Sequence, residues 1–183
     1  MSWGFPEAAV LTCIAFHRFL RTSEFINLRV SQVIFDRLVT QAHLQFPESK
    51  GAARRGVVES VHITDAQLVK LLRKCMAGKQ MGDNILPQTP AQYRELFALA
   101  CHALSLDTEF KPYSLRRGGA TEHFRDFGRM DWTMEIGRWA EARTARVYIN
   151  SALLQFVQME RLKSPLIQQA ADAFKSLVDI CLR

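Results

Sequence analysis

Residues that could act on a phosphate gather between Tyr113 and Tyr148, in the stretch YSLRRGGATEHFRDFGRMDWTMEIGRWAEARTARVY. Arg116 and Arg117 precede a Gly-Gly pair, and the stretch ends on a tyrosine after a Gly-Arg-Trp sequence. Planar guanidinium groups match phosphate oxygens and keep their charge, and a tyrosine hydroxyl can serve as a nucleophile. This arrangement suggests phosphodiester chemistry through a tyrosine.

The composition fits one globular domain that binds a polyanion. The chain has 183 residues, 48% of them hydrophobic, which is enough for a sizeable core. No apolar run is long enough for a membrane helix, and the N-terminus lacks a basic region and a cleavage site. The net charge of +6 favours nucleic acid as the partner. We therefore expect a DNA-associated protein of the cytoplasm, nucleoid or nucleus that is neither secreted nor membrane-bound.

The sequence offers no ligand set for a metal. Its four cysteines lie far apart, none in a Cys-x-x-Cys pair, and the five histidines share no ligand spacing with them. We therefore expect free thiols, no metal and no cofactor.

The N-terminal half predicts two helices and a hairpin. Pro6–Leu20 has proline in its first turn and an apolar face, and Thr22 or Ser23 caps a second helix. A strand is expected within Val33–Phe46 and another at Val57–Ile63, joined by a polar turn that contains glycine.

The C-terminal half predicts helices throughout, at Leu68–Met76, Thr89–Leu104, Ser114–Phe127, Asp131–Gly137 and Glu141–Ile149. The fold class is therefore mostly α with a small antiparallel β-sheet (α+β). We expect one domain over residues 1–160 and an amphipathic helical tail over residues 161–183. The Gly118-Gly119 pair lacks a strand-loop-helix setting, which indicates close helix packing rather than a phosphate cradle.

Two blocks in the first half resemble the catalytic domain of tyrosine recombinases, the phage-integrase family. FLRTSEFINLRVSQV is similar to the family's Leu-Arg-x-x-Glu-x-x-x-Leu stretch, with Arg21 as the phosphate-binding arginine and Glu24 as the structural carboxylate. FPESKG stands at the expected hairpin turn, where the family has its general-acid lysine, so Lys50 is the candidate.

Two further blocks follow in the family's order. YSLRRGGAT resembles the His-x-x-Arg box, with Arg116 as the second phosphate-binding arginine and Tyr113 in place of the usual histidine. IGRWAEARTARVYI resembles the nucleophile region, since Trp139 lies nine positions before Tyr148 (148 − 139), the family's His/Trp-to-tyrosine offset. The resemblance extends from Glu7 to about Leu154.

The resemblance implies DNA breaking and rejoining, as in site-specific recombination or integration of a mobile element. The tyrosine attacks phosphorus, a 3′-phosphotyrosyl bond forms and a 5′-hydroxyl leaves, without a metal. Lysine would protonate the leaving oxygen, and the indole N–H of Trp139 can donate to a phosphate oxygen. A phenol with a pKa near 10 is a poor base at neutral pH, which leaves the role of Tyr113 in question.

Several residues keep a second interpretation. Lys50 could belong to a solvated charge run with Arg54 and Arg55, and Trp139 could be a core residue. Arg117 and Arg138 fit solvated or DNA-backbone contacts better than a catalytic role.

Three functions and two partners follow. The leading function is the recombinase, and the alternatives are a non-catalytic DNA-binding module and a type IB topoisomerase. Double-stranded DNA is the expected partner.

The family pairs this domain with an N-terminal domain, which we expect to be absent or on another polypeptide. The tail beyond Pro165 is expected to pack on its own domain or to dock on a second copy, giving a homo-oligomer on DNA.

Overall fold

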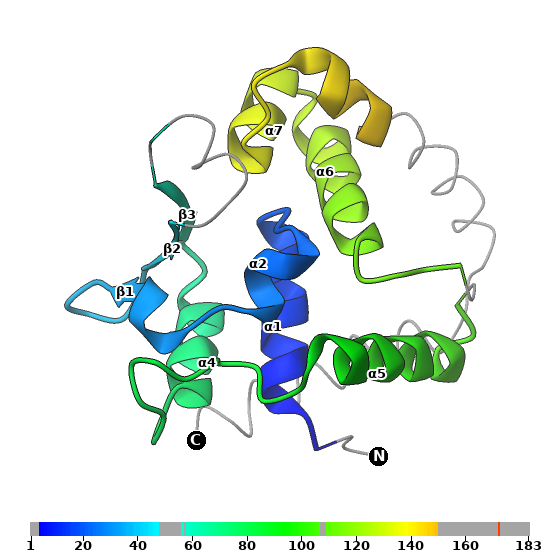
Figure 1. Ribbon diagram of the computed structural model, residues 1–183. Coiled ribbons are helices and arrows are strands. Elements are labelled where there is room, and N and C mark those ends of the chain that lie inside the picture. Colours follow the sequence, from blue (N-terminus) through cyan, green and yellow to red (C-terminus); the bar gives the residue numbers. More distant parts are fainter. Residues whose placement is uncertain (1–3, 48–55, 57, 107–108, 150–171, 173–183) are drawn as a thin grey trace.

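The polypeptide folds mostly into helices beside one small antiparallel sheet, as the sequence predicts (Figure 1). A computed structural model describes residues 4–47, 56, 58–106, 109–149 and 172. The named elements are α1 (Pro6–His17), α2 (Thr22–Ile26), η1 (Val30–Gln32), β1 (Val33–Phe35), β2 (Ala42–Phe46), β3 (Glu59–Ile63), α4 (Ala66–Cys75), α5 (Pro90–Ala103), α6 (Ser114–Phe127) and α7 (Met130–Gly137). Residues 142–149 are also helical.

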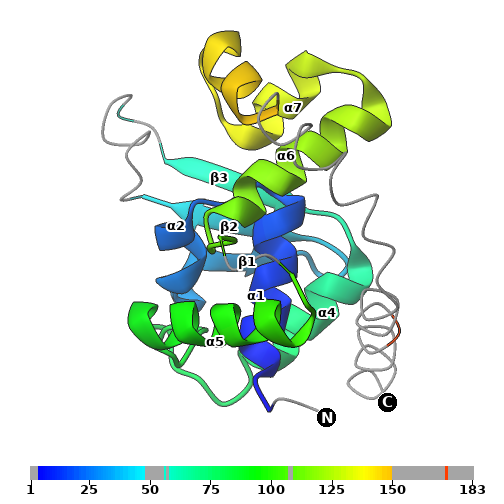
Figure 2. The ribbon, with the colours of Figure 1, turned by 90° about the vertical axis from the view of Figure 1, so that its right-hand side faces the viewer.

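Helix α1 is the centre of the fold. It begins with Pro6, whose missing N–H costs nothing in the first turn, and Glu7 complements the positive end of the helix dipole. Val10, Leu11 and Ile14 are fully buried. The helix packs against α4 and α6, the sheet lies on the same side of it as α4, and α5 crosses one end (Figures 1 and 2).

The sheet has three strands in the order β1-β2-β3, where the sequence predicts two. The expected hairpin is present, with Leu44 opposite Val61. The additional strand arises because the Asp36 carboxylate accepts hydrogen bonds from the backbone N–H groups of Thr40 and Gln41, each at 2.7 Å, and this closes a tight loop between β1 and β2.

Helix α6 approaches α1 closely at the glycine pair. A Cβ on Gly119 would lie 1.9 Å from the Phe16 carbonyl oxygen, and one on Gly118 would lie 3.2 Å from the Phe16 ring. Close helix packing is therefore the reason for these glycines, as the sequence predicts. The contact sets α6 across the end of α1, which places its first turn beside the loop that follows α1.

Helix α5 begins at a capping box, as predicted: the Thr89 hydroxyl accepts from the Gln92 N–H and the Gln92 side chain accepts from the Thr89 N–H. Within the described part of the chain, no helix is long and apolar enough to cross a membrane. The predicted tail at 161–183 lies, apart from Asp172, outside the described residues.

Candidate functional site

Arg116 is the buried centre of the site. It stands in the first turn of α6 and is 2% exposed. Its guanidinium donates to the Phe19 carbonyl and, at 2.7 Å, to the Gly137 carbonyl, and its Cζ lies 4.7 Å from the Trp139 ring centroid. Arg116 thus joins the end of α1 to the end of α7.

The Arg116 guanidinium lies near two other positively charged groups. Burial first, and then the positive charges of Arg21 and Arg138, lower the pKa of Arg116 to about 10. An anion placed among these three groups would favour the charged form. The cluster is therefore suited to bind a phosphate.

Arg21 reaches the cluster because α1 ends at His17, three residues before the predicted Leu20. The chain reverses at Phe19, whose φ of 48° lies in the left-handed region, and Arg21 then becomes the N-cap of α2. The Arg21 N–H donates to Glu24 Oε2 at 2.8 Å, which fixes the start of α2.

The Arg21 guanidinium is held by two carboxylates. Its Nη1 lies 2.6 Å from Glu24 Oε1 and 2.8 Å from Glu59 Oε2. Both glutamates are buried, whereas the Arg21 side chain is 27% exposed. The carboxylates therefore orient Arg21 while part of its guanidinium still faces solvent.

Arg138 corrects a sequence-based interpretation. The sequence suggested a solvated side chain or a DNA-backbone contact, but the side chain is 8% exposed and ion-paired. Its Nη2 lies 2.6 Å from Glu24 Oε2, and its Nη1 lies 3.4 Å from Glu59 Oε2. Phe46 covers it further, with the ring centroid 5.3 Å from Arg138 Cζ.

Tyr148 and Trp139 stack on one another. Their ring centroids are 5.2 Å apart with planes 21° from parallel, and Trp139 also stacks on Phe19 at 6.2 Å. Tyr148 lies on the helix at 142–149, which is anchored by the buried Ala145 and Ile149. Trp139 thus lies between Tyr148 and the Arg116 guanidinium. It is both a packing residue and part of the candidate site.

Tyr113, in the place of the family's histidine, donates a hydrogen bond to the Tyr148 hydroxyl. Burial, followed by this hydrogen bond, raises the pKa of the Tyr113 hydroxyl to about 12. Tyr113 therefore stays protonated at neutral pH, where it can donate a hydrogen bond but cannot accept a proton as a base.

The backbone between α7 and Tyr148 is tightly constrained. A Cβ on Gly137 would lie 2.2 Å from the Trp139 ring, and Arg138 adopts a left-handed conformation with φ 55°. Only glycine fits at Gly137 without moving the indole. This turn therefore determines where Trp139 lies.

The structure brings together Arg21, Tyr113, Arg116, Trp139 and Tyr148 of the six predicted site residues. Lys50 lies outside the described residues. His123, two turns along α6 from Arg116, hydrogen-bonds Thr133 at 2.9 Å.

Sequence reasoning missed the role of Glu59. Along β3, buried and exposed side chains alternate, and the buried ones are Glu59, Val61 and Ile63. A carboxylate at an inward position of a strand requires a cationic or hydrogen-bonding partner, and this signal could have identified it.

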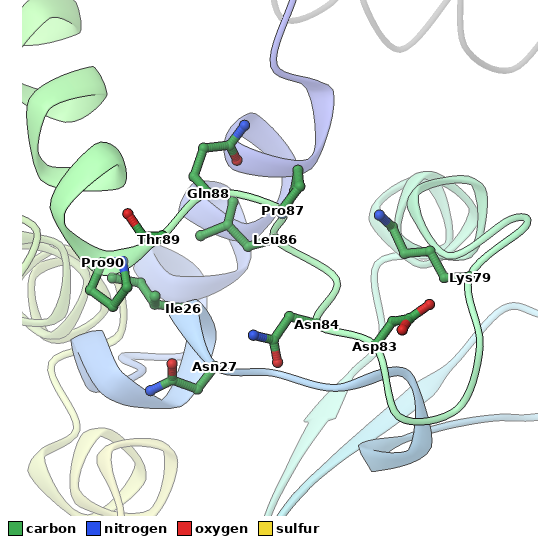
Figure 3. Close-up of a pocket in the computed structure, with 10 residues that line it drawn as sticks. All are labelled: Ile26, Asn27, Lys79, Asp83, Asn84, Leu86, Pro87, Gln88, Thr89 and Pro90. Atoms are coloured by element: carbon green, nitrogen blue, oxygen red, sulfur yellow. The ribbon is translucent and has the colours of Figure 1, made fainter.

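One surface hollow borders the site, and another shares no residue with it. The first, of about 420 Å³, borders the site between β3 and the end of α7 and is lined by Val58, Glu59, Ser60, Met134, Glu135, Arg138 and Trp139. The second, of about 400 Å³, lies among the end of α2, the loop before α5 and the start of α5, and Figure 3 shows its lining residues. None of those is a predicted site residue. Among the described residues, no group of three or more His, Cys, Asp or Glu side chains could hold a metal ion.

Comparison with solved structures shows which fold this is. The chain resembles the XerH site-specific recombinase bound to its difH substrate in a pre-cleavage complex, with a TM-score of 0.63 and 16% identity over 78% of this chain and 42% of that one. It also resembles the XerA recombinase, with a TM-score of 0.56 and 16% identity over 85% of this chain and 63% of that one. A third similar structure is the Tn1549 transposon integrase with circular-intermediate DNA, with a TM-score of 0.55 and 13% identity over 82% and 57% of the two chains.

These likenesses establish a tyrosine recombinase-like fold, as the sequence predicts. The chain spans less than two thirds of the length of each of these three structures. No family model matches the sequence, and no curated protein matches it.

Proposed function

We propose that this protein breaks and rejoins DNA strands through Tyr148, in site-specific recombination or integration. One observation carries the proposal: Tyr148 stacks on Trp139, whose ring lies 4.7 Å from the guanidinium of the buried Arg116. Trp139 and Tyr148 thus meet two arginines from distant parts of the chain, Arg21 and Arg116, within one recombinase-like fold. The DNA-bound XerH and Tn1549 structures support the same class of reaction.

The reaction is a transesterification. The Tyr148 oxygen attacks phosphorus, the bond from phosphorus to the 5′-oxygen breaks, and the DNA 3′-phosphate remains joined to Tyr148. Arg21 and Arg116 would offset the negative charge that develops on the phosphate oxygens, so the scheme requires no metal. Lys50 is the proposed acid for the departing 5′-oxygen, and the Trp139 N–H is a proposed donor to the phosphate.

Tyr113 would position the nucleophile rather than deprotonate it. Its hydroxyl donates to the Tyr148 hydroxyl, and its raised pKa of about 12 keeps its own proton in place. The Tyr148 proton would pass to a water molecule as the bond to phosphorus forms.

Double-stranded DNA is the proposed partner, and the net charge of +6 supports it. Assembly of copies on DNA through the tail beyond Pro165 remains a proposal. Size-exclusion chromatography with DNA, before and after truncation at Ser164, tests it by the mass of the complex.

A DNA-binding module that keeps the fold without cleaving is the second candidate. The hydrogen bond from Tyr113 to Tyr148 favours it, because the phenol, which stands where the family has a histidine, cannot accept the Tyr148 proton at neutral pH. Such a module would bind DNA equally well after Tyr148→Phe.

The test uses nicked suicide substrates, in which cleavage releases a short strand and traps the covalent complex. Denaturing electrophoresis should show a protein–DNA band for the wild type and none for Tyr148→Phe, while both proteins bind duplex DNA. Binding without a band, across a library of sequences, would favour the module instead. Plasmid relaxation without strand exchange would indicate a type IB topoisomerase activity.

A further inference from the structure

Two arginines share two buried carboxylates beside the proposed phosphate site. Glu24 Oε1 pairs with Arg21 at 2.6 Å, and Glu24 Oε2 pairs with Arg138 at 2.6 Å. Glu59 Oε2 lies 2.8 Å from Arg21 and 3.4 Å from Arg138. Each carboxylate therefore contacts both guanidinium groups.

The two arginines differ in access to solvent. The Arg21 side chain is 27% exposed and the Arg138 side chain 8%, against 5% for Glu24. A DNA phosphate can therefore reach Arg21, whereas Arg138 stays inside with the carboxylates.

Binding of a phosphate by Arg21 would take one of the two cations away from Glu24. An Arg21 guanidinium that turns toward DNA must loosen its bond to Glu24. A buried carboxylate that loses its cation is strongly disfavoured, so Glu24 alone would hold Arg21 back. The bond from Arg138 to the other oxygen of Glu24 removes this difficulty.

We propose that Arg138 is a positioning residue that keeps Glu24 ion-paired while Arg21 moves from the carboxylates to a DNA phosphate. Arg138 would not touch the DNA itself. This role rests on the proposed function as far as cleavage is concerned, but the release of Arg21 can also be measured without DNA.

The backbone at Arg138 supports a role for its side chain. Its φ of 55° and ψ of 40° form the left-handed end of α7, a position where glycine is usual. An arginine there bears a conformational cost that glycine would avoid. The two ion pairs and the contact with Phe46 offset this conformational cost.

The DNA-independent test measures how readily phenylglyoxal modifies Arg21, with peptide mass spectrometry as the readout. Arg138→Met should lower the modified fraction of Arg21, because Glu24 then holds Arg21 alone. Arg138→Met combined with Glu24→Gln should restore it, because one positive and one negative charge are then removed together. Arg129→Met is the matched control, since Arg129 pairs with Asp131 on the surface at the start of α7, and it should leave Arg21 unchanged.

The same variants are then assayed for cleavage of the suicide substrate. Arg138→Met should slow cleavage by roughly tenfold to a hundredfold, and the double variant should recover most of that loss. Removing the counter-charge also relieves a fold destabilised by an unpaired buried carboxylate, so urea unfolding is measured on each variant, and the loss and recovery of cleavage are expected under conditions where every variant is fully folded. Arg138→Gly is a second variant that is expected to fold, because glycine suits the left-handed turn, and it should behave like Arg138→Met.

The outcomes separate the two proposals. If the wild type forms no Tyr148-dependent band, the proposed function fails, and Arg21 modification still decides the role of Arg138. Unchanged Arg21 modification in Arg138→Met, or no recovery in the double variant, would overturn the positioning role. So would unfolding of both single variants, since Arg138 would then act in the fold.

Discussion

At the scale of residues, three guanidinium groups cluster at the candidate site. Among the described residues, Arg116 donates to the backbone carbonyl oxygens of Phe19 and Gly137, whereas Arg21 and Arg138 are paired with carboxylates. Burial first, and then its two cationic neighbours, lower the pKa of Arg116, and the second of these causes reflects the crowding of positive charge. A phosphodiester would relieve it, so binding energy is available at the reacting group.

Loss of Arg116 should therefore remove cleavage. Arg116→Ala is expected to slow suicide-substrate cleavage by roughly a hundredfold or more, because one preorganised cation at the developing charge is lost. Circular dichroism checks that the variant is folded. Arg125→Ala is the control, since Arg125 is paired with Glu122 on the surface of the same helix, and its rate should match the wild type.

Tyr113 gives a prediction with a pH dependence. Because its pKa is raised to about 12, Tyr113 does not titrate between pH 6 and pH 9, and Tyr113→Phe should slow cleavage less than tenfold. Tyr113→His should speed cleavage by about tenfold or more at pH 8, because a neutral imidazole can accept the Tyr148 proton. This gain should shrink as the pH falls through about 6.5 and the imidazole becomes charged.

A Tyr113→His enzyme no faster than the wild type at pH 8 would contradict this view of Tyr113. A Tyr113→Phe enzyme without any cleavage would do so as well, since the phenol would then be essential.

At the scale of elements, the close contact between α1 and α6 positions the site. Gly119 lets α6 lie against the last turn of α1, which sets Arg116 beside the Phe19 carbonyl. The short turn at Gly137 and Arg138 then presents Trp139 to the same guanidinium. Small residues at two backbone contacts thus fix the geometry of the cationic cluster.

Gly119→Ala should destabilise the protein by about 2 kcal/mol or more, because the added methyl group would overlap the Phe16 carbonyl oxygen and force the helices apart. Gly118→Ala is the matched neighbour: its methyl group would meet only the edge of the Phe16 ring, and alanine favours the helix. Urea unfolding should place Gly118→Ala within about 1 kcal/mol of the wild type. Equal effects of the two substitutions would contradict this account of the glycine pair.

The elements were more predictable from sequence than the ion pairs. Caps, prolines and strand alternation are local, so the helices, the β2–β3 hairpin and the glycine contact could be predicted. The loop at Asp36 was missed because it is stabilised by the Asp36 carboxylate, which accepts hydrogen bonds from two backbone N–H groups. The pairing of Glu24 with Arg138, which are 114 positions apart, arises only when α2 and the end of α7 pack together.

At the scale of the whole molecule, a basic chain with a recombinase-like fold carries a cluster of three arginines. The net charge is +6, and the chain covers 42% of the XerH structure and 63% of the XerA structure.

DNA binding should weaken steeply with salt. Fluorescence anisotropy with a labelled duplex should give a logarithm of affinity that falls linearly with the logarithm of salt concentration, because each neutralised phosphate releases counterions. Arg21→Met should reduce the slope by about one ion, as expected for one lost phosphate contact. A slope near zero in the wild type would contradict binding through the DNA backbone.

Peptide mapping of the trapped covalent complex tests the central claim most directly. After nuclease and trypsin digestion, mass spectrometry should find a nucleotide attached to Tyr148, in the peptide that begins at Val147. An adduct on Tyr113 or on any other residue, or no adduct in a wild-type protein that binds the suicide DNA, would contradict Tyr148 as the nucleophile.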